Sequence, residues 1–225
     1  MVTVPPRDVR EIADLYQDTR MRITDLLAGA PPAIWQRQVP ACPGWSVRDV
    51  VSHMTAVAQD WADGRLSGAP TDEETAEHVA RFRSRDEAEI LAIWSDATSQ
   101  LRELASTAGL EPPLGDIACH EHDIRSAIGR PGARDAESVH WTADRLLTLL
   151  RPPLPLRIVV EDGEYRSGPV DGTEIRLQTT LFEALRWRTG RRSRAQLAAM
   201  NWSSDPTPVL DHLFLFGPAT ADVVE

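Results

Sequence analysis

The spacing of apolar residues changes abruptly at the prolines of residues 152–155. Before them, apolar residues recur every three to four positions through five successive segments, which is typical of amphipathic helices. After them, Leu156, Ile158 and Val160 alternate with other residues, the period of a strand with one buried face. The sequence therefore predicts an α+β protein, with a helical bundle over residues 1–151 and a small mixed α/β domain over residues 152–225.

The ends of these segments carry recognisable start and stop signals. Ser46 with Asp49, and Ser84 with Glu87, form capping-box patterns, and Gly129 is placed to end a helix. The strongly apolar tail of residues 208–217 is expected to pack onto one of the two parts. The helices expected in the bundle are residues 7–28, 46–60, 84–108, 115–129 and 136–150, with a short one near 72–79.

Composition narrows the class of partner. The 24 basic and 34 acidic side chains give a net charge of −10, which disfavours the clustered positive charge that nucleic acid requires. No apolar run approaches the roughly 20 residues that span a bilayer, and no signal peptide is visible. Two cysteines are too few for a disulfide framework. We expect a cytoplasmic protein that binds neither membrane nor nucleic acid.

The segment of residues 115–129, GDIACHEHDIRSAIG, concentrates metal-binding side chains in one expected helix. Asp116 and His120 lie four residues apart and therefore project from the same face, about one turn from each other. His53, on an earlier helix, shares its face with apolar neighbours and should point inward. Three ligands from two facing helices leave one coordination position open, as catalytic zinc sites do.

Each of these residues has an alternative interpretation. A single inward histidine is more often a satisfied core residue, so the metal hypothesis rests on the combination of His53, Asp116 and His120. Asp123 follows His120 by three residues and either orients it through the second ring nitrogen or is an exposed carboxylate paired with Arg125 or with solvent. Cys119 diverges from the face of His120 and is expected to be a small buried residue.

Three stretches resemble one known family. Residues 42–53, CPGWSVRDVVSH, are similar to its loop-helix signature, and Asp116-x-x-x-His120-x-x-Asp123 is similar to its Glu-x-x-x-His-x-x-Asp helix. Residues 189–202 are similar to its C-terminal part. The sequence thus resembles the maleylpyruvate isomerase family of mycothiol-dependent enzymes from actinobacteria, whose N-terminal half is a DinB-like four-helix bundle.

This resemblance implies a site and a chemistry. The metal ligands would be His53, Asp116 and His120, holding zinc or a similar divalent ion. Mycothiol would replace water on that ion and bind as a thiolate, the nucleophile toward a small electrophilic substrate. The activity implied is isomerisation or thiol S-transfer. Position 116 departs from the family, since its aspartate is one methylene shorter than the usual glutamate. Either the ion must lie closer to the helix or the helix must shift.

Other functions remain open from the sequence. Arg191 and Arg192 are weak candidates for binding an acidic substrate or the thiol, because guanidinium pairs with carboxylates. A metal-assisted hydrolase would need a general base near the ion, for which Asp123 and Glu121 are the nearby candidates. A non-catalytic stress-response module that binds metal and thiol is the third possibility. We expect a low-molecular-weight thiol and a small molecule as partners, and either a monomer or a homodimer.

Overall fold

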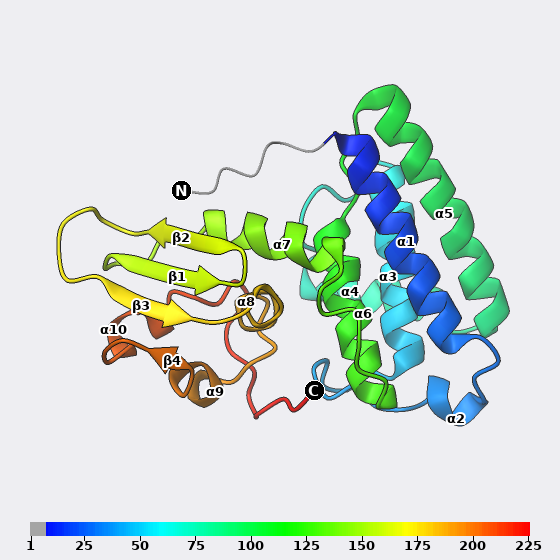
Figure 1. Cartoon of the computed structure of the whole chain (residues 1–225). Coiled ribbons are helices and arrows are strands. Elements are labelled where there is room, and N and C mark those ends of the chain that lie inside the picture. The colour runs from blue at the N-terminus through cyan, green and yellow to red at the C-terminus, as the bar shows by residue number, and fades with distance from the viewer. Residues whose placement is uncertain (1–7) are drawn as a thin grey trace. The chain divides into compact units, whose positions relative to one another are not determined.

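The computed structural model describes residues 8–225, and its contacts divide the chain into two compact units (Figure 1). The N-terminal unit ends at Gly132, and the C-terminal unit is Ala133–Glu225. The helix of residues 136–150, assigned to the bundle from its periodicity, packs against elements of the C-terminal unit. The domain boundary at residue 152 stays a prediction.

The N-terminal unit is helical, as expected. The long helix α3 packs against α5 and α6, and α1 also packs against both of them. Their inward faces bury large side chains such as Trp94, Leu101, Ile117 and Met54. The helices of this unit are α1 (Val9–Leu27), α2 (Pro32–Trp35), α3 (Val47–Ala62), α4 (Asp72–Arg81), α5 (Glu87–Ala108) and α6 (Leu114–Ile128).

One capping box is confirmed and one was placed wrongly. Ser46 caps α3, with its side chain accepting from the Asp49 amide while Asp49 accepts from the Ser46 amide. Helix α5 is capped by Asp86 together with Glu89, not by Ser84. The sequence holds two overlapping patterns, and a turn from the Arg85 amide to the Phe82 carbonyl keeps Ser84 outside the helix.

The C-terminal unit contains the expected mixed sheet, in the order β2-β1-β3-β4. Strand β1 pairs antiparallel with β2 and parallel with β3, and the inward residues Leu156, Ile158 and Leu177 are buried. Helix α7 packs against α8 and β2. The elements are α7 (Glu137–Thr148), β1 (Leu156–Val160), β2 (Gly163–Ser167), β3 (Ile175–Gln178), α8 (Leu181–Arg188), α9 (Arg194–Ala198), β4 (Asn201–Trp202) and α10 (Thr207–Leu210).

The apolar tail packs only in part. Val209, Leu210 and Leu213 are buried, as predicted, whereas Leu215 and Phe216 stay about half exposed. The short helix α10 holds Val209 and Leu210, and Leu213 lies in the turn that follows it. Beyond this turn the chain has no helix or strand that would keep one face buried.

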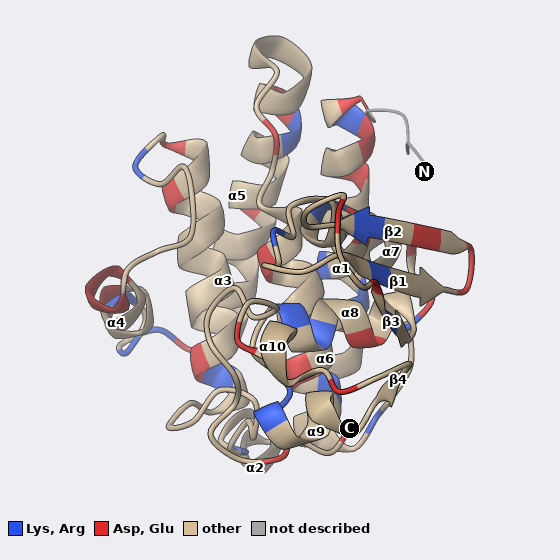
Figure 2. Cartoon of the chain, turned by 90° about the vertical axis from the view of Figure 1, so that its left-hand side faces the viewer, with Lys and Arg blue, Asp and Glu red and all other residues tan. Residues whose placement is uncertain are grey.

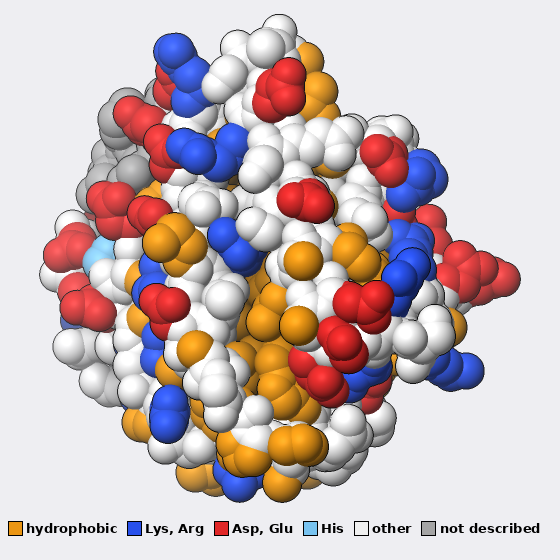
Figure 3. All heavy atoms as spheres, turned by 90° about the vertical axis from the view of Figure 1, so that its right-hand side faces the viewer, with side chains coloured by type: hydrophobic (Ala, Val, Ile, Leu, Met, Phe, Trp, Pro, Cys, Tyr) orange, Lys and Arg blue, Asp and Glu red, His pale blue; other side chains and the backbone are white. Residues whose placement is uncertain are grey.

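Acidic and basic side chains both occur on the surface of the described residues (Figure 2 and Figure 3). The first turn of α4 is acidic, which suits the positive end of a helix dipole, and it is visible in red in Figure 2. On the face drawn in Figure 3, acidic and basic side chains are interspersed. Among the described residues, no helix combines the length and the apolar character needed to cross a membrane.

Candidate metal centre

Helices α3 and α6 bring together the three residues singled out from the sequence. Asp116 Oδ1 lies 3.6 Å from His120 Nε2, one turn along the same helix. The same oxygen lies 3.4 Å from His53 Nε2, which α3 supplies across the bundle. One ligand atom from each residue falls within 4.8 Å of the other two.

These separations suit a small divalent ion. Ligand atoms placed about 2.0–2.1 Å from a tetrahedral ion lie about 3.3–3.4 Å from each other, close to the two distances seen here. Two imidazoles and one carboxylate form a donor set that zinc accepts, with a fourth position left over. The shorter aspartate therefore reaches both histidines. Its side chain is 24% exposed while the two histidine side chains are buried, so the open side of the group lies at Asp116.

Asp123 contacts the ring nitrogen of His120 that does not face Asp116. His120 Nδ1 lies 2.9 Å from Asp123 Oδ2, and the Asp123 side chain is fully buried. The alternative of an exposed carboxylate paired with Arg125 is excluded by this burial. Because an ionised carboxylate only accepts, Nδ1 of neutral His120 carries the hydrogen and Nε2 presents its lone pair toward Asp116.

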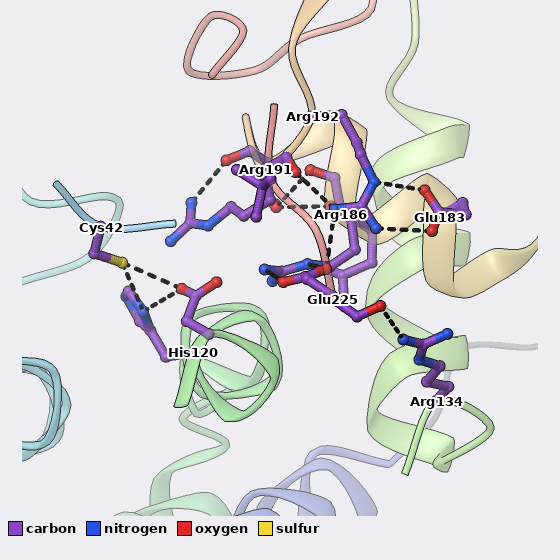
Figure 4. Close-up of polar contacts among 12 residues, drawn as sticks. Cys42, His120, Arg134, Glu183, Arg186, Arg191, Arg192 and Glu225 are labelled. Carbon is purple, nitrogen blue, oxygen red and sulfur yellow. Dashed lines mark hydrogen bonds and ion pairs between the residues drawn. The ribbon is translucent and has the colours of Figure 1, made fainter. Parts of the chain in front are cut away.

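Cys42 contacts both His120 and Asp123, which the sequence did not indicate. Its sulfur donates to Asp123 Oδ2 at 3.3 Å and lies 3.9 Å from His120 Nδ1 (Figure 4). Cys42, His120 and Asp123 form a second group with potential ligand atoms. The Cys-Pro-Gly-Trp sequence just before the α3 cap was the available signal, but a loop contact of this kind has no fixed spacing.

Trp45, from the same loop, packs against both histidines. Its ring centroid lies 5.1 Å from that of His53 and 6.4 Å from that of His120. Trp45 lies within the Cys-Pro-Gly-Trp sequence, but its contact with the two imidazoles was not predicted. In the structure it forms an apolar wall beside the two imidazoles.

His53 also has polar support, and this was missed. His53 Nδ1 faces His78 Nδ1 at 3.3 Å, and His78 Nε2 faces Asp60 Oδ2 at 3.1 Å. Burial opposes the ionisation of Asp60, but hydrogen bonds from Arg81 and Arg65 outweigh it and lower its pKa to about 2. His78 lies on α4, in a polar stretch whose sequence shows little periodicity.

The family is decided by the N-terminal part of the chain. The model of the mycothiol maleylpyruvate isomerase N-terminal domain matches residues 16–151, more than half of the sequence. The chain belongs to this family. Helices α3 and α6, which carry the three candidate ligands, lie inside the matched region.

Two solved structures share the fold across nearly the whole chain. One is a mycothiol-dependent maleylpyruvate isomerase, with 12% identity and a TM-score of 0.59. The other is a histidine-to-alanine mutant of a mycothiol-dependent maleylpyruvate isomerase, with 13% identity and the same TM-score. Each match covers 91% of this chain and 97% of the other. A comparison with curated proteins finds no match.

Glu121 forms ion pairs with two arginines. Its side chain is fully buried, with Arg22 Nη2 at 2.7 Å and Arg125 Nη2 at 2.9 Å. Two guanidinium groups hold it as a structural carboxylate, so it is poorly suited to act as a general base. Asp123, the other base considered, already accepts from His120 and Cys42.

The C-terminal arginines lie in the other unit. Arg192 is buried and binds Glu183 through two nitrogens and Glu225 Oε2 at 2.9 Å. Fully buried Arg186 also binds the Glu225 carboxylate. Arg191 donates to the Thr189 carbonyl (Figure 4). Arg192 would have to exchange a carboxylate partner to bind a ligand, and a role for Arg191 or Arg192 in substrate or thiol binding stays a prediction.

Proposed function

We propose that this chain is a divalent-metal-dependent enzyme, with His53, Asp116 and His120 as ligands and zinc as the ion. The observation that carries the proposal is the convergence of three ligand atoms at separations that suit a tetrahedral ion. They come from two helices in a member of the mycothiol maleylpyruvate isomerase N-terminal domain family.

The activity we propose is mycothiol-dependent isomerisation or thiol S-transfer on a small electrophilic substrate. The two structures of the same fold are mycothiol-dependent maleylpyruvate isomerases, which supports this thiol and this reaction class. We also propose a cytoplasmic location and small-molecule partners, with no nucleic acid or membrane.

The bound ion would lower the pKa of a coordinating thiol, so that the thiolate is present at neutral pH. The residues of the chain have separate tasks. Asp123 holds the His120 ring in the tautomer that leaves Nε2 free. Trp45 covers the two imidazoles and reduces the access of water on its side. The partial exposure of Asp116 leaves a side from which a small thiol can approach.

Metal content after purification without chelator tests the site. We expect about one divalent ion per chain in the wild type and a loss of most of it in His53→Ala and in His120→Ala. His212→Ala, an exposed histidine of the C-terminal unit, is the matched control and should keep the ion. Wild-type protein that stays metal-free under metal-replete conditions would overturn the proposal.

A thermal-shift panel with thiol and metal then tests the cofactor and separates the alternatives. Stabilisation by mycothiol only when the metal is present supports a thiol-dependent site. Turnover of maleylpyruvate that requires mycothiol supports the isomerase, whereas binding without turnover of any electrophile supports the stress-response module. Hydrolysis without thiol would support the metal-assisted hydrolase, which the engagement of Glu121 and Asp123 disfavours.

A further inference from the structure

We propose that His78 and Asp60 are positioning residues that fix the tautomer and ring orientation of His53, so that its Nε2 lone pair points toward Asp116. The metal-binding consequence rests on the proposed function, whereas the tautomer itself does not. The pair does for His53 what Asp123 does for His120, but it acts through an intervening imidazole.

The placement of the three groups follows from helix geometry. His53 and Asp60 both lie on α3, seven residues apart, so they share a face two turns and about 10.5 Å apart. His78, on the short helix α4, lies between them with one ring nitrogen toward each. All three residues are at most 6% exposed, so water is largely kept from these contacts.

Asp60 sets the direction of the hydrogen bonds. Arg81 donates to both of its oxygens, at 2.9 and 2.8 Å, and Arg65 Nε donates to Oδ1 at 2.9 Å. A carboxylate bound to two guanidinium groups is ionised and can only accept. His78 must therefore donate from Nε2.

The remaining hydrogen positions follow in turn. In a neutral imidazole one nitrogen donates and the other accepts, so His78 Nδ1 accepts and His53 Nδ1 donates to it. His53 Nε2 is then a lone pair that faces the Asp116 carboxylate at 3.4 Å. His120 Nε2 faces the same carboxylate at 3.6 Å, also as a lone pair.

Three acceptors that face one another in this way favour a cation between them. Without Asp60 and His78, His53 Nε2 could carry its hydrogen and donate to Asp116, which would satisfy the contact without an ion. The pair thus biases the site toward cation binding. If His78 had only a structural role, its contacts would stabilise the packing of α4, and its replacement would leave the metal affinity of the folded protein unchanged.

Nitrogen-15 NMR of the histidines in metal-free protein tests the tautomer directly. We expect His53 to carry its hydrogen on Nδ1 and His78 on Nε2 near neutral pH. A neutral His53 with its hydrogen on Nε2 would overturn the inference, whether or not the protein binds metal. Failure of the wild type to bind zinc would instead overturn the proposed function.

Zinc titration of His78 variants tests the consequence. His78→Phe keeps an aromatic ring at this position and removes both hydrogen bonds, and we expect its Kd for zinc to rise about 10–100-fold. His78→Asn places an amide oxygen near the Nδ1 position and should recover most of that loss. His140→Phe, on α7 of the C-terminal unit, is the matched control.

The variants also distinguish positioning from folding. Circular dichroism and urea unfolding identify the folded fraction, on which the Kd is measured. Asp60→Asn should weaken zinc binding, and adding it to His78→Phe should cause little further loss, because both act along one chain of contacts. Equal zinc affinity in wild type, His78→Phe and His78→Asn would overturn the inference, as would fully additive losses.

Discussion

The two histidines of the candidate metal centre are supported in different ways. His120 is oriented by Asp123, three residues along the same helix, through one buried hydrogen bond. His53 is oriented through His78 of another helix, with Asp60 and its arginines behind it. The first arrangement depends on local helix geometry, whereas the second exists only if α4 packs against α3. Direct support should therefore be the more robust, and indirect support the easier to lose.

The largest effect is expected at Asp116, which both histidines share. Asp116→Asn should weaken zinc binding by more than about 100-fold, because a charged ligand becomes a neutral amide. This loss is larger than the one expected from replacing a residue that only supports a ligand. Asp116→Glu, which restores the family's usual residue, should keep about one ion per chain. Calorimetric titration of both variants measures this. Unchanged affinity in Asp116→Asn would place the ion elsewhere.

A direct comparison of Asp123→Asn with Asp60→Asn tests the difference between the two sides. Asp123 touches a candidate ligand, so its replacement should raise the Kd for zinc about 10–100-fold. Asp60 acts through His78, and we expect a smaller rise. The same titration under one buffer condition compares the two. A larger loss in Asp60→Asn would reverse our ordering of direct and indirect support.

Acid should weaken the His53 side through Asp60. Its folded pKa of about 2 lies below the ordinary value of 3.8, so its ion pairs stabilise the fold above pH 4. That contribution is lost as the pH falls from about 4 to 2, when the carboxylate becomes protonated. Urea unfolding of metal-free protein across this range measures the decline. Asp60→Asn should show a shallower decline than the wild type, and parallel curves would contradict the assignment.

The smallest effect is expected for Cys42→Ser. The hydroxyl can still donate to Asp123, so the orientation of His120 is kept and zinc affinity should change by only a few-fold. A large loss would instead identify Cys42 as a ligand, within the second group formed with His120 and Asp123. Titration with cobalt adds a check, because a thiolate ligand gives an intense charge-transfer band.

Much of the fold could be predicted because its determinants are local. The helical stripes and the alternation of β1 predicted the type of the long elements, although the start of α5 was misplaced and the helix of residues 136–150 packs in the C-terminal unit. The tail was harder, because the burial of Leu213 and the exposure of Phe216 depend on the path of the chain after α10. The proximity of Asp116, His120 and Asp123 could be predicted because their spacing on one helix sufficed.

The sequence by itself determined that Asp116, His120 and Asp123 project from neighbouring positions of one helix, because 3.6 residues per turn fixes those relations. It also indicated that His53 points inward. Only the tertiary structure decided that His53 meets Asp116, that Cys42 reaches Asp123 and that His78 lies between His53 and Asp60. These contacts join segments far apart in the chain, and their geometry is set by helix packing and loop paths, which no spacing in the sequence encodes.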